Sequence, residues 1–296
     1  MDKMYLALFY GFRTLVRWVP FGVLKPLLFL LADGIRGVNK KHRRIIRINL
    51  DLAYGSSMDA AEKERILKAC YRNLALNGAD FIRNQNSTKE EILSKVTFVN
   101  EGVLAEALSQ GRTLVFQTAH YGNWELVPLA LAAKYGPLSG IGRPLDSVVM
   151  NEIVRSNREQ LDIELIDKRG AMRPMLKAAK AGRNLGLLVD QSTGAGEGLL
   201  VDFFGKKVRH TPAASIIARR VNGLIVPVFM TTANHQQFTL TFYTPIEVAK
   251  TEEMEKDILE ATQAQARVTE EAIRAKPDEW FWFHKRWKGE HAHAYM

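Results

Sequence analysis

Residues 114–131 read LVFQTAHYGNWELVPLAL and place two apolar runs on either side of a polar turn. The first run, residues 114–116, predicts a buried strand, and the second, residues 126–131, predicts a helix. His120 stands at the end of the strand, and Glu125 stands in the first turn of the helix. A histidine and a carboxylate in this arrangement suit a general base and the acid that orients it.

The spacing of His120 and Glu125 requires a bend between them. Residues five apart on one continuous helix lie roughly 140° apart around the axis and do not meet. Gly122 supplies the conformational freedom for the bend, and Asn123 is a good N-cap residue. We expect Glu125, near the positive end of the helix dipole, to orient His120, whose other ring nitrogen takes a proton from a hydroxyl. The alternative is a histidine that caps a loop and a glutamate that only complements the dipole.

Strand and helix patterns alternate along most of the chain. Strands are expected at residues 113–117, 138–142, 163–166, 185–189, 224–230 and 238–243. Helices are expected at residues 58–82, 103–108, 124–135, 148–161, 172–180, 213–221 and 252–275. This alternation predicts an α/β fold with a largely parallel central sheet flanked by helices, because parallel strands need crossovers. His120 and Asp190 both follow predicted strands, at the sheet edge where ligands bind.

Composition restricts the class of protein further. The 296 residues are 47% hydrophobic, enough for one large domain with a substantial core. Lys and Arg outnumber Asp and Glu by 41 to 32, which gives a net charge of +9 and attracts anionic partners. Anionic lipid and an acidic carrier protein fit this charge, and no nucleic-acid-binding motif is present. The single cysteine, Cys70, excludes an internal disulfide, indicates a reducing compartment and lies at a core position of a predicted helix.

The N-terminal segment, residues 1–34, predicts a membrane anchor. Apolar and aromatic side chains fill residues 4–31, but three cations and two prolines interrupt them: Arg13, Arg17, Lys25, Pro20 and Pro26. Because a spanning helix needs about 20 predominantly apolar residues, we expect an in-plane or shallow anchor. Residues 36–47 contain six Lys or Arg, each worth about 1 kcal/mol beside an anionic bilayer, which favours the cytoplasmic leaflet. A solvated helix face is the alternative for this basic run.

The segment from His120 to Glu125 resembles the His-x4-Glu/Asp signature of the lysophospholipid and lipid A acyltransferase superfamily. Further similar segments follow in the order of that family: Arg155-Ser156-Asn157, a strand ending in Asp190-Gln191, Phe203-Phe204-Gly205, and residues 277–288, which read PDEWFWFHKRWK. Together they span about residues 35–288. The resemblance is closest to the late, secondary acyltransferases of lipid A biosynthesis, and acyltransferases of phosphatidylinositol mannosides are similar too.

This resemblance implies a glycerolphosphate-acyltransferase-like fold, with an N-terminal anchoring helix in residues 1–34 and an acyltransferase domain in residues 35–290. It implies an O-acyltransferase of the inner (cytoplasmic) membrane with its catalytic domain on the cytoplasmic side. His120 then deprotonates a hydroxyl of a lipid A precursor, which attacks the thioester of acyl-ACP. The implied partners are acyl carrier protein, anionic membrane lipids and the lipid acceptor. No cofactor is implied besides the donor, acyl-ACP or acyl-CoA.

Three other functions fit the same residues. A lysophospholipid or glycolipid acyltransferase would use acyl-CoA or acyl-ACP with a different acceptor. A lipid esterase would use water instead of the acceptor, and a lipid-binding protein would have no turnover. The spacings of His120, Asp190 and His210 match no metal-ligand signature, so no metal is expected.

Several polar residues are candidates for substrate binding: Arg143, Arg155, Arg158, Asn123, Asp190 and Gln191. A guanidinium group can donate two parallel hydrogen bonds to two oxygens of a phosphate. The family resemblance makes Arg155 the preferred candidate for this contact. A solvated role is an equal alternative for Arg143 and Arg158. Asp190 and Gln191 are expected to orient substrate or support the region of His120, and a turn stabilised by the Asp190 side chain is the alternative.

The glycine-rich segment 194–198 predicts a loop, and residues 199–204 predict an apolar edge for acyl chains or the bilayer. Core packing is the alternative for these apolar residues.

Overall fold

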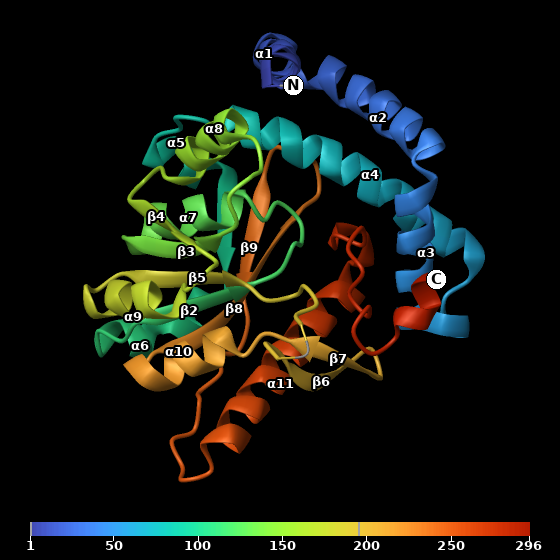
Figure 1. The fold of residues 1–296 in the computed structure, drawn as a ribbon. Helices are drawn as coiled ribbons and strands as arrows, with labels where there is room; N and C mark the ends of the chain where they lie inside the picture. Colours follow the sequence, from blue (N-terminus) through green and yellow to red (C-terminus); the bar gives the residue numbers. More distant parts are fainter. Residues whose placement is uncertain (1, 195) are drawn as a thin grey trace.

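The computed structural model describes residues 2–194 and 196–296, and its centre is a seven-stranded sheet (Figure 1). The strands in spatial order are β1 (Val96–Val99), β9 (Phe238–Phe242), β8 (Leu224–Thr232), β2 (Leu114–Thr118), β5 (Asn184–Leu188), β3 (Leu138–Gly142) and β4 (Ile163–Asp167). Within this sheet of described residues, only the β8–β9 pair is antiparallel. The predicted α/β fold with a largely parallel sheet is therefore confirmed.

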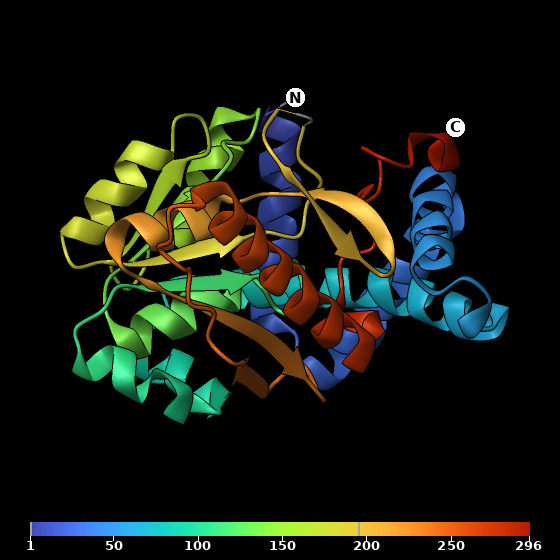
Figure 2. The same cartoon turned by 90° about the horizontal axis from the view of Figure 1, so that it is seen from below.

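Helices cover both faces of this sheet (Figure 2). The helices of the described residues are α1 (Asp2–Trp18), α2 (Phe21–Val38), α3 (Lys40–Tyr54), α4 (Ala60–Arg83), α5 (Lys89–Lys95), α6 (Ala105–Ser109), α7 (Leu126–Tyr135), α8 (Val148–Arg158), α9 (Met172–Lys180), α10 (Ala213–Val221) and α11 (Met254–Ala275). Helices α5, α6 and α7 pack on one face, and α9, α10 and the start of α11 pack on the other. Strand β2 is buried along its whole length because both of its faces are covered.

The predicted elements differ from the observed ones mainly at their ends. Helices α9 and α10 and strand β3 have the predicted bounds, whereas α8 ends at Arg158, three residues earlier than expected. The sequence prediction missed β1, α3, α5 and the hairpin of β6 (Leu199–Phe203) and β7 (Lys206–His210). In that hairpin Phe203 and Phe204 are buried in a second core, so core packing is the correct alternative for them. Leu200 is exposed.

The N-terminal segment forms two helices, α1 and α2, that are separated at Pro20. One face packs against α4: Val16, Leu24 and Leu28 are buried in a cluster with side chains of that helix. The other face exposes a row of large apolar side chains: Leu8, Trp18, Val23, Leu27, Leu30, Leu31, Ile35 and Val38. None of the helices in residues 2–194 and 196–296 combines the length and apolar character needed to cross a bilayer. The anchoring role of this segment stays a prediction.

Candidate active site

The loop between β2 and α7 has a sharp turn at Gly122. Gly122 has φ +55°, and a Cβ atom there would lie 1.7 Å from the carbonyl oxygen of Met230. Only glycine allows the loop to pass this close to β8. Helix α4 holds the turn from the other side, because Asn77 Nδ2 donates to the Gly122 carbonyl at 2.7 Å. The expectation that Gly122 makes the bend is confirmed.

We expect Gly122→Ala to destabilise the protein by about 1–3 kcal/mol more than Gly111→Ala does. Gly111 has a similar φ of +62°, but a Cβ atom there meets nothing within 4 Å. Both variants therefore carry the backbone strain of alanine at positive φ, and only Gly122→Ala adds the clash. Urea unfolding of the two variants measures the difference, and equal losses would show that the contact with Met230 relaxes freely.

His120 is oriented by Asp190. The carboxylate Oδ1 of Asp190 lies 2.8 Å from His120 Nδ1, and Oδ2 accepts the backbone N–H of His120 at 3.1 Å. A carboxylate only accepts, so Nδ1 carries the proton and Nε2 is left unprotonated in neutral His120. Nε2 lies 3.4 Å from Nε2 of Gln191, whose side chain is exposed. This nitrogen therefore accepts from the Gln191 amide and points toward the accessible side of the site.

His120 and Asp190 each stabilise the charged form of the other. Burial lowers the pKa of His120, but the charge and the hydrogen bond of Asp190 outweigh it, and the pKa lies above the ordinary 6.5. Burial raises the pKa of Asp190, yet His120 holds it well below its usual range. The Asp190 side chain is fully buried. The structure shows the expected contact of Asp190 with the region of His120. A role of Asp190 in orienting substrate stays a prediction.

In this structure Glu125 is hydrogen-bonded to Arg158, and the partner of His120 Nδ1 is Asp190 and not the expected Glu125. Its carboxylate pairs with Arg158 on α8, with Oε2 accepting from Nε at 2.9 Å and Oε1 from Nη2 at 2.5 Å. The residue stands at the N-terminal end of α7 and its side chain turns toward α8. Glu125 remains close enough to His120 to raise the pKa of the imidazole by its charge.

Asn123 lies behind the turn. It is 1% exposed, its Oδ1 accepts the Leu126 N–H at 3.2 Å, and its Nδ2 donates to Asp80 at 3.2 Å. The expected bond to a backbone N–H three residues on is therefore formed, but the N-cap residue of α7 is Glu125 and not Asn123. A contact of Asn123 with substrate stays a prediction, and in this structure its side chain is buried and bonded within the protein.

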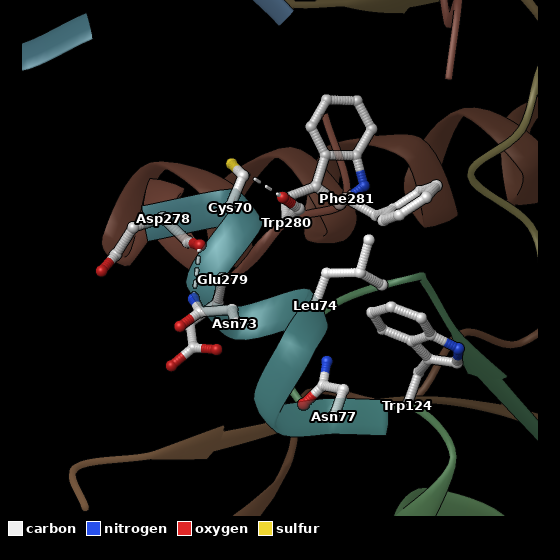
Figure 3. Close-up of a pocket in the computed structure, with 9 residues that line it drawn as sticks. All are labelled: Cys70, Asn73, Leu74, Asn77, Trp124, Asp278, Glu279, Trp280 and Phe281. Carbon is white, nitrogen blue, oxygen red and sulfur yellow. Dashed lines mark hydrogen bonds between the residues drawn. The ribbon is translucent and has the colours of Figure 1, made fainter. Parts of the chain in front are cut away.

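Aromatic side chains form one wall of the site. The ring centroids of Trp124 and Phe281 lie 5.6 Å and 6.0 Å from that of His120. Together with Leu74 of α4 they line a small pocket (Figure 3), in which the three side chains face one another. Sequence reasoning did not single out these three residues, because apolar residues of this kind are usual in any core.

Three arginines line a second pocket, which lies beside α8. Arg143, Arg155 and Arg158 all contribute to it, as do Asn151 and Asp167. Arg155 is paired with Glu159 at 2.8 Å, and Arg143 is largely exposed. The structure therefore brings the three candidate arginines together, while their contact with a phosphate stays a prediction.

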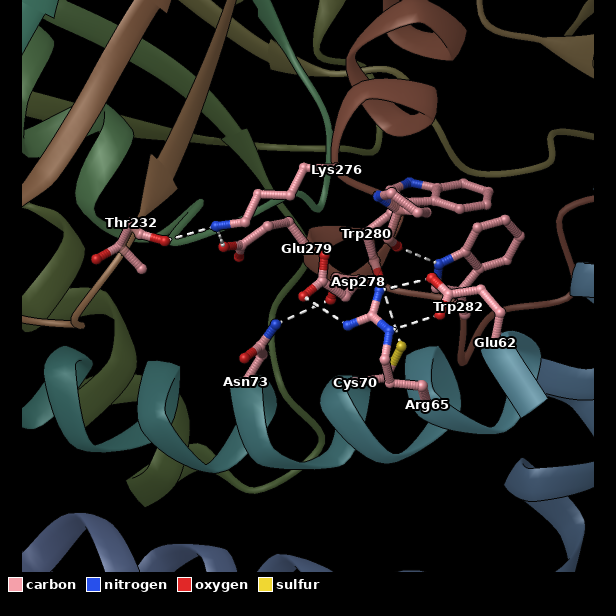
Figure 4. Close-up of polar contacts among 11 residues, drawn as sticks. Glu62, Arg65, Cys70, Asn73, Thr232, Lys276, Asp278, Glu279, Trp280 and Trp282 are labelled. Carbon is pink, nitrogen blue, oxygen red and sulfur yellow. Dashed lines mark hydrogen bonds and ion pairs between the residues drawn. The ribbon is translucent and has the colours of Figure 1, made fainter. Parts of the chain in front are cut away.

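The C-terminal segment, residues 277–288, closes the site from behind. The backbone N–H of Phe281 donates to the His120 carbonyl at 2.8 Å, and the Gly122 N–H donates to the Glu279 carbonyl at 2.9 Å. Figure 4 shows how α4 holds this segment: Asn73 Nδ2 donates to the Asp278 carbonyl at 2.8 Å. Sequence reasoning identified the segment through its family resemblance but assigned it no contact with His120.

Comparison with known proteins gives a consistent set of relatives. A family model described as bacterial lipid A biosynthesis acyltransferase matches residues 2–289. The chain is 23% identical over 301 residues to a lipid A biosynthesis acyltransferase of Shigella flexneri, covering 97% of this chain and 93% of that protein. It is 18% identical over 218 residues to one of Haemophilus influenzae, covering 74% and 68%.

Two further similarities are more limited. A phosphatidylinositol mannoside acyltransferase of Mycolicibacterium smegmatis is 26% identical over 129 residues, which are 42% of each chain. The solved structure of the 1-acyl-sn-glycerophosphate acyltransferase PlsC from Thermotoga maritima aligns with a TM-score of 0.37 at 14% identity. That alignment covers 86% of this chain and 98% of the other.

Proposed function

The chain belongs to the bacterial lipid A biosynthesis acyltransferase family and is an acyltransferase, and from this premise we propose that it acylates a hydroxyl of a lipid A precursor. The observation that carries the proposal is the His120–Asp190 pair, whose unprotonated Nε2 lies beside the exposed side chain of Gln191. A base in this position accepts the proton of a bound hydroxyl, and the oxygen attacks the carbonyl carbon of an acyl thioester. The thiol of the donor leaves, and the acyl ester is the product.

The groups around His120 have distinct roles in this proposal. Asp190 fixes the tautomer and stabilises the imidazolium that forms during attack. The backbone N–H groups of Asn123 and Trp124 are the proposed donors to the oxyanion, because the N–H of Gly122 is already bonded to Glu279. Trp124 and Phe281 supply an apolar surface for the acyl chain near the reacting carbonyl.

Arginine side chains are the proposed contacts for the acceptor. The pocket of Arg143, Arg155 and Arg158 adjoins Glu125, which is hydrogen-bonded to Arg158. Lipid A precursors and glycolipids with phosphate groups offer oxygens that match the forked donors of guanidinium groups. For the donor we propose acyl-ACP, since an acidic carrier protein complements a chain with a net charge of +9.

The test of the proposed function uses the purified full chain with lipid vesicles. A lipid A precursor, a phosphatidylinositol mannoside and a lysophosphatidate are each offered with acyl-ACP or with acyl-CoA, and products are identified by mass spectrometry. We expect the lipid A precursor to gain one acyl group from acyl-ACP. Acylation of one of the other acceptors alone would replace the proposed substrate, and release of free fatty acid alone would show an esterase.

We also propose that the exposed apolar face of α1 and α2 lies in the membrane interface. Trp18 is 82% exposed and Leu30 is 73% exposed on this face. Burying one such side chain in lipid is worth about 1.5–3 kcal/mol, so Trp18→Glu and Leu30→Glu should each weaken binding to anionic vesicles by about tenfold or more. Vesicle co-sedimentation measures this.

The matched control for vesicle binding is Leu259→Glu on α11, where an apolar side chain is 40% exposed on another helix. We expect it to bind vesicles like the wild type. Equal binding of all three variants would show that the face formed by α1 and α2 does not contact lipid.

A further inference from the structure

The Asp190 carboxylate has a third donor, which comes from the C-terminal segment. Oδ1 accepts from His120 Nδ1, while Oδ2 accepts both the His120 N–H at 3.1 Å and the indole N–H of Trp280 at 2.9 Å. The Asp190 side chain is fully buried, so solvent does not replace a donor that is lost. The indole therefore decides where Oδ2 lies, and with it the direction in which Oδ1 faces.

Contacts that do not involve Asp190 hold the Trp280 indole in place. Trp280 is 1% exposed and its backbone forms an antiparallel bridge with Tyr121. Its ring packs edge-on against Trp282, with centroids 4.5 Å apart, and against His284 at 5.2 Å. This packing leaves the ring little freedom to turn. The indole N–H is therefore held in one position, as the supporting groups of a preorganised site must be.

We propose that Trp280 is a positioning residue of the acyl-transfer site, whose indole N–H locks the Asp190 carboxylate in the orientation that engages His120. The inference rests on the proposed function of His120 as the general base. Without this donor, Oδ2 keeps a single hydrogen bond and the carboxylate gains freedom to rotate away from His120, so its charge and its hydrogen bond raise the pKa of His120 less. The hydrogen bond from Trp280 is also among the interactions that keep the pKa of Asp190 low.

Four ionisable groups face His120 from the elements around it. Asp190 follows β5, Glu125 precedes α7, Arg158 is on α8, and His284 belongs to the C-terminal segment. Trp280 contacts only Asp190 among these by a hydrogen bond. A change at Trp280 that acts through the carboxylate should therefore alter the titration of His120 and leave the Glu125–Arg158 pair intact.

The chain offers a matched control in Trp287. Its ring is fully buried in the same aromatic cluster, with centroids 6.2 Å from Trp280 and 5.7 Å from Phe203. Its indole nitrogen, however, has no hydrogen-bond partner in the described part of the chain. Trp280→Phe and Trp287→Phe therefore remove similar volumes from one core, and only the first removes a hydrogen bond.

For Trp280→Phe we expect kcat to fall roughly tenfold with KM changed less than about twofold, as the loss of one hydrogen bond to a charged group predicts. The pKa of His120, followed by NMR of the imidazole in the full chain without substrate, should fall. Trp287→Phe should leave kcat and this pKa at wild-type values. Equal behaviour of the two variants would overturn the proposal and assign Trp280 to core packing.

A second measurement needs no variant at position 280. In the wild-type chain, the indole N–H signal of Trp280 should shift with pH in step with the titration of His120, because Asp190 links the two groups. The indole signal of Trp287 should not follow that titration. A Trp280 signal that is insensitive to the state of His120 would overturn the proposal. Both NMR readouts are independent of acyl transfer, so they still decide the role of Trp280 if the proposed function fails.

Discussion

Replacing His120 with alanine is expected to lower kcat/KM for acyl transfer by about a thousandfold or more while the protein still folds. The imidazole is the only base that the structure places at the accessible edge of the described sheet with a carboxylate behind it. General base catalysis contributes about 10²–10⁴ in rate, and the imidazolium also carries the charge formed during attack. The rate of labelled acyl transfer by purified protein measures the loss.

The control for this variant is His293→Ala, which changes a histidine near the C-terminus, outside the site. Circular dichroism and thermal unfolding of both variants establish that the fold is kept. The His120 side chain is 21% exposed, so its removal leaves a small gap and not a large buried cavity. A folded His120→Ala variant with wild-type rate would remove His120 from the mechanism.

Replacing Asp190 is expected to lower the rate of acyl transfer far more than replacing Glu125. Asp190→Asn keeps the shape of the side chain, but an amide permits the wrong tautomer of His120 and no longer stabilises its cation. We expect the plateau rate to fall by about 10²–10⁴. Glu125→Gln should cost far less, about tenfold, because the carboxylate of Glu125 is bonded to Arg158 and not to the imidazole. Steady-state kinetics of the two variants make the comparison.

The double variant Glu125→Gln with Arg158→Gln is the control for the salt bridge, since it removes both partners and leaves no unpaired charge. If Glu125→Gln proved as damaging as Asp190→Asn, the pair from the sequence signature would be the functional one. The Glu125–Arg158 contact would then have to open when substrate binds.

The sequence led to the loop and its strand, but it paired His120 with Glu125, whereas the hydrogen bond in the structure is to Asp190, and the difference has a physical reason. Glu125 is near in the chain, whereas the contact with Asp190 depends on how two strands pair. Thr118 of β2 lies opposite Leu188 of β5, so the residues two positions further on, His120 and Asp190, emerge side by side. Sequence patterns show that both follow strands, but they do not show which strands are neighbours or in what register.

Parts of the site that depend on local chain geometry can be predicted from the sequence, whereas contacts between distant segments cannot. The bend at Gly122 follows from local chain geometry, which a short segment determines. The burial of Asn123 and the contact of Trp280 with Asp190 depend on α4 and the C-terminal segment, which join the site only in the folded chain. The three arginines gather at one pocket because α8 and the loop after β3 lie together, which the strand and helix pattern does not reveal.

The pH dependence of kcat/KM for acyl transfer tests the function of the His120–Asp190 pair most directly. His120 must be neutral to accept a proton, and its folded pKa is raised, so activity should increase with pH through an acid limb above pH 6.5. Asp190→Asn removes the charge that raises this pKa, so the limb should move to lower pH while the plateau falls. An unchanged limb and plateau in Asp190→Asn would contradict the account.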